Sequence, residues 1–283
     1  MTHPQVWFIT GASRGMGTEF ARAALTAGHH VVATGRDAQR VLDAVGEHDN
    51  LLAVALDVTD GTAATTAVAA ATERFGRIDV LVNNAGSFQA GFFEELSAEQ
   101  FRTQMDTNFF GALNVTRAVL PVMRQQRSGR IISISSTAGV VANAGGSAYS
   151  ASKFALEGWM EALRGEVEPF GIYTTVVEPG FFRTDLLAEG NSTFWGDVHV
   201  DDYAPLSDQA KGFFRSMEGQ QTGDPAKLAQ TIIKLAAMPE PPLRLPAGED
   251  SVDGIVQKGA QLAEQARAFP ELSNDLNHEG AAA

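Results

Sequence analysis

The sequence predicts an α/β protein, a doubly wound parallel sheet with helices on both faces, in a single domain. Three observations predict it. Short β-branched runs alternate along the chain with longer stretches of helical periodicity. Several of the short runs are apolar throughout, as expected for strands that are buried on both faces. The length of 283 residues lies within the range of one α/β domain.

The expected strands are the short apolar runs between predicted helices. They are Val6–Thr10, His30–Thr34, Leu52–Leu56, Val80–Asn83, Arg130–Ser135 and Tyr173–Val177. The expected helices carry apolar residues at a helical period and are Gly17–Ala27, Thr62–Phe75, Ala98–Gln125, Ser150–Phe170 and Ser251–Ala268. Repeated βα units of this kind imply right-handed crossovers.

Composition narrows the class of function. With 44% hydrophobic and 19% charged residues the chain is typical of a soluble protein with a sizeable core. The formal net charge of -13 disfavours nucleic-acid binding, because an acidic surface repels phosphate backbones. The absence of cysteine excludes disulfides and thiolate metal sites. His29, His30, His48 and His199 lack the spacing of a metal cluster, so we expect no metal.

The segment Met1–Gln5 has no basic region typical of a secretory signal, and no window approaches 18 consecutive apolar residues. We therefore expect a cytoplasmic protein that does not enter membranes.

One region, about 187–223, has no clean period and interleaves aromatic residues with acids and glycines. It is too long for an ordinary connection. One interpretation is a surface excursion that packs its own aromatic side chains, and the other is an insertion that forms a lid or wall of a substrate pocket. We favour the pocket wall. Glu94-Glu95 reads as a solvated helix start rather than a carboxylate pair.

A glycine-rich segment, 10–17, joins the first strand to the first helix. Glycines allow a tight turn and let a pyrophosphate approach the backbone, and the helix N-terminus then offers free N–H groups to the phosphate charge. The spacing is G-x3-G-x-G rather than the usual G-x-G-x-x-G. A dinucleotide site is therefore indicated mainly by the position of these glycines at the first strand–helix junction. The candidate dinucleotide-binding residues here are Gly11, Ser13, Arg14, Gly15, Met16 and Gly17.

Two arginines favour NADP(H) over NAD(H). A cation at the end of the second strand suits the 2′-phosphate of NADP, whereas a carboxylate suits the ribose hydroxyls of NAD. Here Arg36 follows that strand and Arg14 lies in the glycine loop. Guanidinium groups bind phosphate oxygens through several donors at once. The neighbouring Asp37 caps the next helix or binds ribose, with the cap favoured.

Two further strand ends supply candidates for the adenosine half. Asp57, followed by Val58, is placed to accept from the adenine amine, or caps the helix that begins near residue 59 or 60. After the fourth strand, small residues let the backbone lie against a ribose, although such a sequence also forms ordinary turns that bind nothing. These residues are Asn84, Ala85 and Gly86.

Tyr149 and Lys153 are spaced by four, which places both side chains on one face of a helix. A free phenol has a pKa near 10 and is a poor base at neutral pH. A neighbouring ammonium favours the phenolate, so we expect Lys153 to bring the tyrosine toward working range. A lone Y-x3-K is common by chance. This one follows a Gly-Gly-Ser segment and a serine-rich strand end.

Together these motifs resemble the short-chain dehydrogenase/reductase family, in its single-domain branch with a Rossmann-type sheet. The resemblance covers roughly Val6 to Thr184. The motifs follow in the order of the family and are Thr10–Gly17, Asn83–Gly86, Asn108, Ser136, Tyr149 with Lys153, and Pro179-Gly180. The family's serine lies thirteen positions before its tyrosine, which selects Ser136 over Ser133 and Ser135.

The resemblance implies a role for each matched residue. Tyr149 exchanges a proton with the carbonyl or alcohol oxygen, and Ser136 stabilises the charge on that oxygen. Lys153 binds the nicotinamide ribose and keeps the tyrosine acidic. Asn108 holds a proton-relay water. The resemblance implies that Pro179, Gly180 and Thr184 hold the nicotinamide and pyrophosphate region of the cofactor. Phe182 is expected to lie near them, although Phe181 and Phe182 could each belong either to the core or to the pocket lining.

The chain departs from the common family pattern at its C-terminal end. The glycine-rich final strand is replaced by the stretch 241–248, followed by an extension over about 249–283. This puts the family's tetramer in doubt, and we expect a dimer through Ala98–Gln125 and Ser150–Phe170. The ending and the segment 179–185 are similar to the hydroxysteroid and retinol dehydrogenase-like subgroup.

The leading hypothesis is an NADP(H)-linked oxidoreductase that interconverts a carbonyl and an alcohol, with an apolar substrate suggested by the aromatic residues of 187–223. A non-catalytic NADP(H) sensor is the alternative, although it has no need of the full Asn-Ser-Tyr-Lys set. Sugar-nucleotide epimerisation or dehydration ranks lower, because those relatives have another glycine spacing. Substrate identity and reaction direction stay open.

Overall fold

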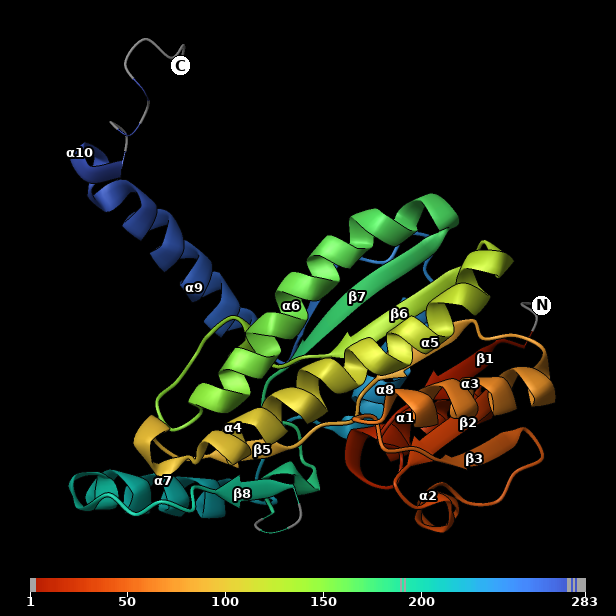
Figure 1. Ribbon diagram of the computed structural model, residues 1–283, viewed down its shortest axis with the longest axis horizontal. Helices are drawn as coiled ribbons and strands as arrows, with labels where there is room; N and C mark the ends of the chain where they lie inside the picture. The colour runs from red at the N-terminus through yellow and green to blue at the C-terminus, as the bar shows by residue number, and fades with distance from the viewer. Residues whose placement is uncertain (1–3, 189, 191, 274–275, 277, 279–283) are drawn as a thin grey trace.

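The computed structural model describes residues 4–188, 190, 192–273, 276 and 278 (Figure 1). Its centre is a seven-stranded sheet in the order β3-β2-β1-β4-β6-β7-β9, and all neighbouring strands are parallel. The strands are β1 (Val6–Ile9), β2 (His30–Gly35), β3 (Leu51–Ala55), β4 (Val80–Asn83), β6 (Gly129–Ile134), β7 (Ile172–Pro179) and β9 (Arg244–Ala247). The predicted doubly wound sheet is confirmed.

Helices cover both faces of this sheet. On one face lie α3 (Gly61–Phe75), α5 (Gly111–Gln126) and α6 (Ser147–Val167). On the other face lie α1 (Gly15–Thr26), α2 (Ala38–Val45) and α8 (Pro225–Ala236). Side chains alternate across each strand, so Phe8 of β1 enters the first core and Trp7 the second. Both rings are fully buried.

The predicted helix Ala98–Gln125 is divided into three parts. The chain forms α4 (Ala98–Met105), then a π-helical turn (Asp106–Phe110), then α5. The turn carries Asn108, which is 2% exposed. A π-turn changes the direction of side chains within a continuous helix and is frequent at functional sites.

Sequence reasoning missed the seventh strand. β9 (Arg244–Ala247) pairs with β7 at the edge of the sheet, although it is short and contains Pro246. Proline is tolerated at a sheet edge because one side of the strand needs no ladder donor. The glycine-rich ending is therefore replaced, but a final strand is present.

The region predicted as a substrate-loop insertion, 187–223, contains a helix and a strand. The strand β8 (Thr193–Trp195) pairs in parallel with β5 (Phe88–Ala90), and the helix is α7 (Ala204–Met217). In Figure 1 both lie beside the sheet, on the side where its strands end. Residues 189 and 191 of this region fall outside the described residues.

The C-terminal extension forms α9 (Glu249–Ala268) and the short α10 (Pro270–Ser273). Figure 1 shows α9 projecting away from the rest of the molecule. Of the predicted extension, 274–275, 277 and 279–283 lie outside the described residues, as does 1–3 of the predicted N-terminal segment. Within the part of the chain that the structure describes, no helix is both long and apolar enough to cross a membrane.

Candidate active site

The glycine loop after β1 is held against the loop after β4. The Asn84 side-chain amide donates to the carbonyl oxygens of Thr10 at 2.9 Å and of Gly11 at 3.1 Å. The Thr10 hydroxyl accepts from the backbone N–H groups of Asn84 and Ala85, at 2.9 and 3.0 Å. The side chain of Asn84 thus fixes the geometry of the glycine loop, and the backbone N–H groups of Asn84 and Ala85 bond to Thr10 of that loop.

Glycine is required at these positions for two different reasons. Gly11 and Gly15 have φ values of +67° and +56°, a region that favours glycine. At Gly17 a Cβ would overlap the carbonyl oxygen of Gly11, because α1 packs closely against the loop. Gly17, which was predicted as a cofactor contact, therefore acts through packing and does not line the cavity described next.

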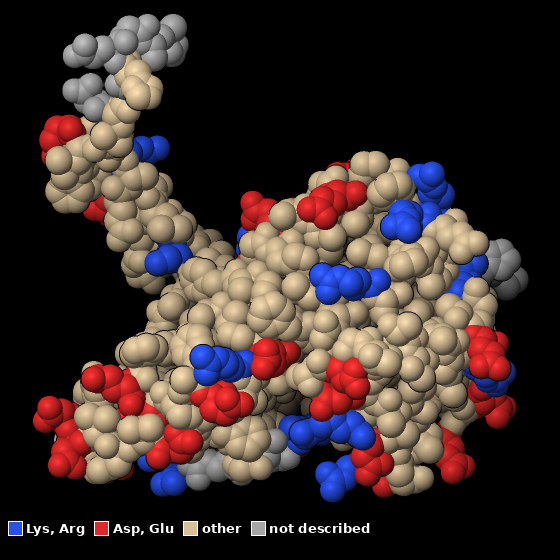
Figure 2. Space-filling model, viewed as in Figure 1, with Lys and Arg blue, Asp and Glu red and all other residues tan. Residues whose placement is uncertain are grey.

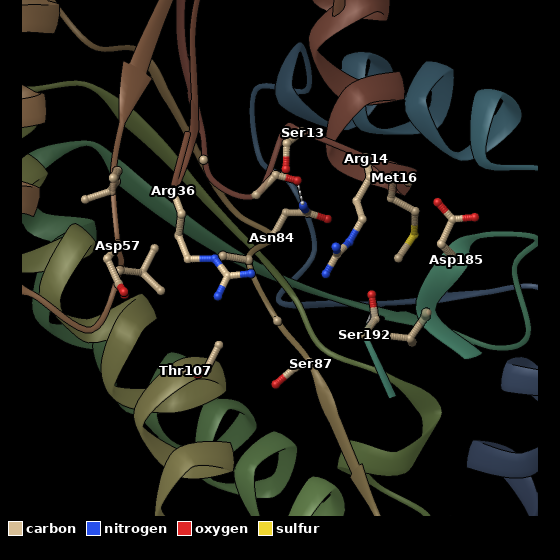
Figure 3. A pocket seen from close by; sticks show the side chains of 18 of the residues that line it. Ser13, Arg14, Met16, Arg36, Asp57, Asn84, Ser87, Thr107, Asp185 and Ser192 are labelled. Carbon is tan, nitrogen blue, oxygen red and sulfur yellow. Dashed lines mark hydrogen bonds between the residues drawn. The ribbon is translucent and has the colours of Figure 1, made fainter. Parts of the chain in front are cut away.

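A cavity of about 580 Å³ opens at the carboxyl ends of β1, β2, β3 and β4. Strand order reverses between β1 and β4, and ligands of open α/β sheets bind at such a switch point. The predicted cofactor residues that line it are Gly11, Ser13, Arg14, Gly15, Met16, Arg36, Asp57, Val58, Asn84, Ala85, Gly86 and Thr184. Figure 3 shows the side chains of Arg14 and Arg36 reaching into it from different elements.

The structure adds lining residues that the sequence did not indicate. Arg40 lies in the first turn of α2, four residues after Arg36, and Thr107 lies on the π-turn, while Ser192 and Phe194 come from the excursion that contains β8. The remaining additions are Ser87, Gln89, Thr103, Asp185 and Leu186. Only Arg40 carried a local indication, since it shares a short segment with Arg36. The others depend on long-range packing.

One end of the cavity is strongly cationic. Burial lowers the pKa of the Arg14 guanidinium, and the charges of Arg36 and Arg40 lower it further, while Asp185 opposes them. Three guanidinium groups therefore repel one another around the same space, which a polyanion would relieve. The face in Figure 2 carries many acidic side chains, and basic ones gather beside a hollow at its lower edge.

The two aspartates left open by the sequence have defined local partners. Asp37 caps α2, accepting from the N–H groups of Gln39 at 2.9 Å and Arg40 at 3.4 Å. Asp57 closes a turn by accepting from Thr59 N–H at 2.9 Å, and the cap of α3 is instead Asp60. Asp57 keeps its place on the cavity wall, so the turn and a ligand role are compatible.

The predicted catalytic residues converge where β6 meets the start of α6. The Lys153 ammonium donates to the carbonyl oxygen of Ile134 at 2.8 Å and lies 5.6 Å from the centroid of the Tyr149 ring. The Ser136 hydroxyl interacts with the Tyr149 phenol and also accepts from Ala138 N–H at 3.1 Å. The structure thus brings together Tyr149 and Lys153, which the spacing placed on one helix face, and Ser136, which the family resemblance selected.

The pKa of Tyr149 departs from the expected direction. Burial raises it above the ordinary value of 10, and the hydrogen bond with Ser136 opposes the rise. Lys153, which was expected to lower this pKa, is not among the groups that shift it, so the phenol is protonated at neutral pH. Burial lowers the pKa of Lys153 to about 8, against the charge of Glu157.

Asn108 ties the π-turn to the loop after β4 and to α6. Its amide donates to the Ser87 carbonyl oxygen at 3.0 Å and to the Ser152 hydroxyl at 3.2 Å, and its own oxygen accepts from Ser87 N–H at 2.9 Å. Gln104, fully buried, donates to the same Ser87 oxygen at 2.9 Å. Asn108 is therefore fixed beside the helix face that carries Tyr149 and Lys153.

The segment after β7 divides between this site and the core. The Pro179 carbonyl oxygen accepts from the Thr137 hydroxyl at 3.3 Å, and Gly180 lies against Asp250. The Phe182 ring packs on Gly223 and lines a separate cavity of about 340 Å³ beside α8, so the structure places it away from the large cavity. Phe181 is 41% exposed.

Aromatic rings continue from Tyr149 into the excursion. Phe88 meets the Tyr149 ring edge-on with centroids 5.0 Å apart, and Phe214 of α7 meets Phe88 at 5.4 Å. Trp195 and Phe213 lie 5.8 and 5.6 Å from Phe214. We call Phe88, Trp195, Phe213 and Phe214 the aromatic wall. Three of its four rings belong to 187–223 and pack on one another, and Phe88 joins them to Tyr149.

A buried carboxylate anchors α7 to this wall. Glu95, which is 7% exposed, accepts from the Ser207 hydroxyl at 2.8 and 2.6 Å and from Phe92 N–H at 3.1 Å. The expectation of a solvated Glu94-Glu95 helix start is therefore wrong for Glu95. Its hydrogen bonds satisfy the charge inside the protein.

Comparison with known families gives the class of the protein. The family model described as short chain dehydrogenase matches residues 5–194. The chain belongs to this family.

Relatives of this short chain dehydrogenase align beyond the matched segment. This chain is 38% identical over 271 residues to "Oxidoreductase BOA17" of Botryotinia fuckeliana, and the alignment covers 95% of this chain and 98% of that protein. It is 39% identical over 251 residues to "3-ketodihydrosphingosine reductase" of Bacteroides thetaiotaomicron, covering 87% and 88%. A short-chain dehydrogenase structure from Streptomyces avermitilis superposes with a TM-score of 0.88 at 39% identity, covering 97% of this chain and all of that one.

As a short chain dehydrogenase with relatives named oxidoreductases and reductases, the protein is an oxidoreductase. Within the described residues, no group of three His, Asp or Glu side chains is arranged to hold a metal ion.

Proposed function

We propose that this oxidoreductase is a cytoplasmic NADP(H)-dependent enzyme that interconverts a carbonyl and an alcohol, with Tyr149 as the proton-transferring residue. One observation carries the proposal. Tyr149, Ser136 and Lys153 converge at the start of α6, while the neighbouring cavity ends in the guanidinium groups of Arg14 and Arg36. A proton-transfer group and a phosphate-binding end thus belong to one part of the sheet.

The lining of the cavity fits NADP(H). Gly11 lets the glycine loop pack directly against the loop after β4, since a Cβ there would meet Ala85 at 2.8 Å, and this places both loops on the wall of one cavity. Arg14, Arg36 and Arg40 would hold the 2′-phosphate, because guanidinium groups bind phosphate oxygens through paired donors. Asp37 also lines the cavity, but it caps α2 through Oδ1 and lies 3.8 Å from Arg40, so three arginines outweigh this carboxylate at the adenosine end. The bound nicotinamide would supply or accept the hydride.

The side chains of this protein supply the proton and the position. Tyr149, held protonated by burial, donates its proton to the carbonyl oxygen during reduction and regains one during oxidation. The Ser136 hydroxyl donates to the same oxygen and stabilises its developing charge. Lys153 would bind the nicotinamide ribose, and Asn108 would support the proton path from the buried side of α6. Pro179, Gly180 and Thr184 would lie beside the nicotinamide.

The aromatic wall favours an apolar carbonyl substrate. It begins at Phe88, in contact with Tyr149, and extends to rings that remain partly open, such as Phe213 at 49% exposed. The printed name of the Bacteroides relative, 3-ketodihydrosphingosine reductase, refers to a keto substrate and supports a ketone here. Ring and chain compounds both satisfy this chemistry.

A second candidate, an NADP(H) sensor without activity, has less support. A sensor needs the arginine-lined cavity but gains nothing from a buried Tyr149 in contact with Ser136. A panel of aliphatic, aromatic and long-chain ketones and alcohols, followed through NADPH absorbance, separates the two. Turnover of any apolar member supports the enzyme, while tight NADPH binding without turnover of any member favours the sensor.

We also propose a homodimer through the outer faces of α4, α5 and α6. Two large apolar side chains are exposed there, Phe110 at 47% and Phe154 at 43%. Covering these two rings in a dimer would remove apolar surface from water. Light scattering should give the mass of two chains for the wild type, and Phe110→Asp with Phe154→Asp should give one. A single-chain mass for the wild type would contradict the proposal.

A further inference from the structure

A buried charge cluster lies behind the catalytic residues, on the elements α6, β7 and β9. Arg244 of β9 contacts the carboxylates of Glu157 and Glu178, the latter at 3.4 Å, and that of Glu161 at 2.6 Å. Glu157 and Glu178 have side chains 5% and 0% exposed, whereas Glu161 is 61% exposed. Two carboxyls thus share one arginine inside the protein, and the third shares it at the surface.

Two buried carboxylate oxygens in this cluster have no well-aligned hydrogen-bond donor in the part of the chain that the structure describes, although the Ser135 hydroxyl lies close enough to Glu157 to lower its pKa. Among the described residues, no donor has hydrogen-bond geometry to Glu157 Oε1 or Glu178 Oε2. Burial raises the pKa of Glu178 to about 7, and the charge of Glu157 adds to the rise. The protonated carboxyl of Glu178 donates a hydrogen bond to Glu157, so the pair carries one negative charge at pH values below about 7.

The cluster continues into the active site through α6. Glu157 lies one turn after Lys153 on the same side of the helix, and its charge raises the pKa of that lysine against the effect of burial. The groups that act on Glu157 are Lys153 on its own helix, Ser135 after β6, Glu178 on β7 and Arg244 on β9. The lysine is thus the only one of these groups that reaches Tyr149.

We propose that Glu157, held by Arg244 one helical turn after Lys153, is a positioning residue that keeps the buried Lys153 ammonium charged. The inference rests on the proposed function, in which a charged Lys153 binds the cofactor ribose. Without Glu157, burial releases the proton of Lys153 at a lower pH, and the side chain then loses its attraction for an oxygen-rich partner.

A purely structural role, in which the carboxylates only join β9 to α6, makes a different prediction. Glu161 bonds the same Arg244 from the same helix but is exposed and is not among the groups that shift Lys153. Glu157→Gln and Glu161→Gln remove the same charge from the same arginine. Only the first should alter the titration of Lys153, so the two variants form a matched pair.

The titration can be measured directly in the full-length protein. The sequence has five lysines, Lys153, Lys211, Lys227, Lys234 and Lys258, so lysine labelled with ¹³C at Cε gives few resonances, and Lys153→Met assigns the relevant one. The wild-type midpoint should lie near pH 8, following the lowered pKa of Lys153. Glu157→Gln should move it down by about one pH unit, as expected when a nearby opposite charge is lost.

The control variants decide the interpretation. Glu161→Gln should leave the midpoint unchanged, and Glu157→Asp should restore it toward the wild-type value. Glu157→Met, of similar volume, should reproduce the downward shift if the glutamine variant folds poorly. An unchanged Lys153 midpoint in whichever charge-free variant folds would overturn the inference.

A second readout links the charge to the cofactor. NADPH affinity at pH 8 should fall several-fold in Glu157→Gln and stay unchanged in Glu161→Gln. A shifted midpoint with unaltered affinity would overturn the link to cofactor binding. Neither result depends on turnover, so failure of the ketone panel would contradict the proposed function separately.

Discussion

The Lys153 ammonium lies 5.6 Å from the centroid of the Tyr149 ring, one helical turn away on the same face of α6. Its hydrogen bond to Ile134 fixes it at the end of β6, next to the loop that carries Ser136. The pKa of the phenol is nevertheless raised by burial, opposed by the hydrogen bond with Ser136. Under the proposed function, the protonated phenol of Tyr149 would serve as the proton donor, and the reductive direction would need no prior ionisation.

Cofactor choice should depend on the arginines at the cavity end. Arg36→Ala should lower the ratio of kcat/KM with NADPH to kcat/KM with NADH by about tenfold or more, because a charge-assisted hydrogen bond contributes roughly 1.5–3 kcal/mol. Arg267→Ala removes an exposed arginine in the last turn of α9 and should leave the ratio unchanged. Steady-state kinetics with both cofactors measures it, and an unaltered ratio in Arg36→Ala would refute the phosphate role.

The aromatic wall should determine the size of substrate that binds. Phe214→Ala removes the ring that contacts Phe88, Trp195 and Phe213, so kcat/KM for a bulky apolar ketone should fall by roughly tenfold. A small ketone that does not reach α7 should change by less than about twofold. Phe269→Ala, at the far end of α9, is the control. Equal losses for large and small ketones would argue against the wall as a substrate surface.

The bond between Ser207 and Glu95 should stabilise α7 locally. Ser207→Ala leaves the buried Glu95 without its hydroxyl donor, at a local cost of about 1–3 kcal/mol. Hydrogen exchange across 204–217 should accelerate about tenfold or more while the central sheet is unaffected. Ser216→Ala removes a hydroxyl from an exposed position of the same helix and should have little effect. Unchanged exchange in Ser207→Ala would contradict the anchor.

Stability should depend on pH through Glu178. Its folded-state pKa of about 7 lies above the ordinary 4.5, so the folded protein holds a proton that the unfolded chain has released. The stabilisation is present below about pH 4.5 and is lost as pH rises through 7. The side chain of the Glu178→Gln variant cannot ionise. The free energy of unfolding of this variant, relative to that of the wild type, should therefore rise by roughly 1–3 kcal/mol between pH 5.5 and pH 8.

Urea unfolding at these two pH values measures the difference. Glu161→Gln, on the same arginine but exposed, should show the pH dependence of the wild type. If the difference between Glu178→Gln and the wild type were the same at both pH values, the raised pKa of Glu178 would be wrong.

Features with a local cause were predictable from the sequence. The strands around Phe8 and Val32 are apolar throughout, and helical spacing alone places Tyr149 and Lys153 on one face. The loop carrying Gly11 could be placed because it follows the first strand. Family order then selected Ser136, which the structure brings into contact with Tyr149.

Features that depend on distant partners were not predictable. β9 is too short to recognise without β7 beside it, and β8 is defined only by its pairing with β5. The Phe182 ring turns toward Gly223, a contact that no local pattern encodes. The pairing of Glu157 with Glu178 joins a helix to a strand, and burial raises the pKa of Tyr149, which a neighbouring ammonium was expected to lower.

The central claim is that Tyr149 transfers the proton in an NADP(H)-linked carbonyl–alcohol reaction. Tyr149→Phe keeps the ring against Phe88 and removes only the hydroxyl, so folding and NADPH binding should be preserved. The most direct measurement is turnover of an apolar ketone with NADPH in this variant, with NADPH affinity determined in parallel. The account predicts wild-type affinity with turnover reduced by at least about 100-fold. Turnover within a few-fold of the wild type would contradict it.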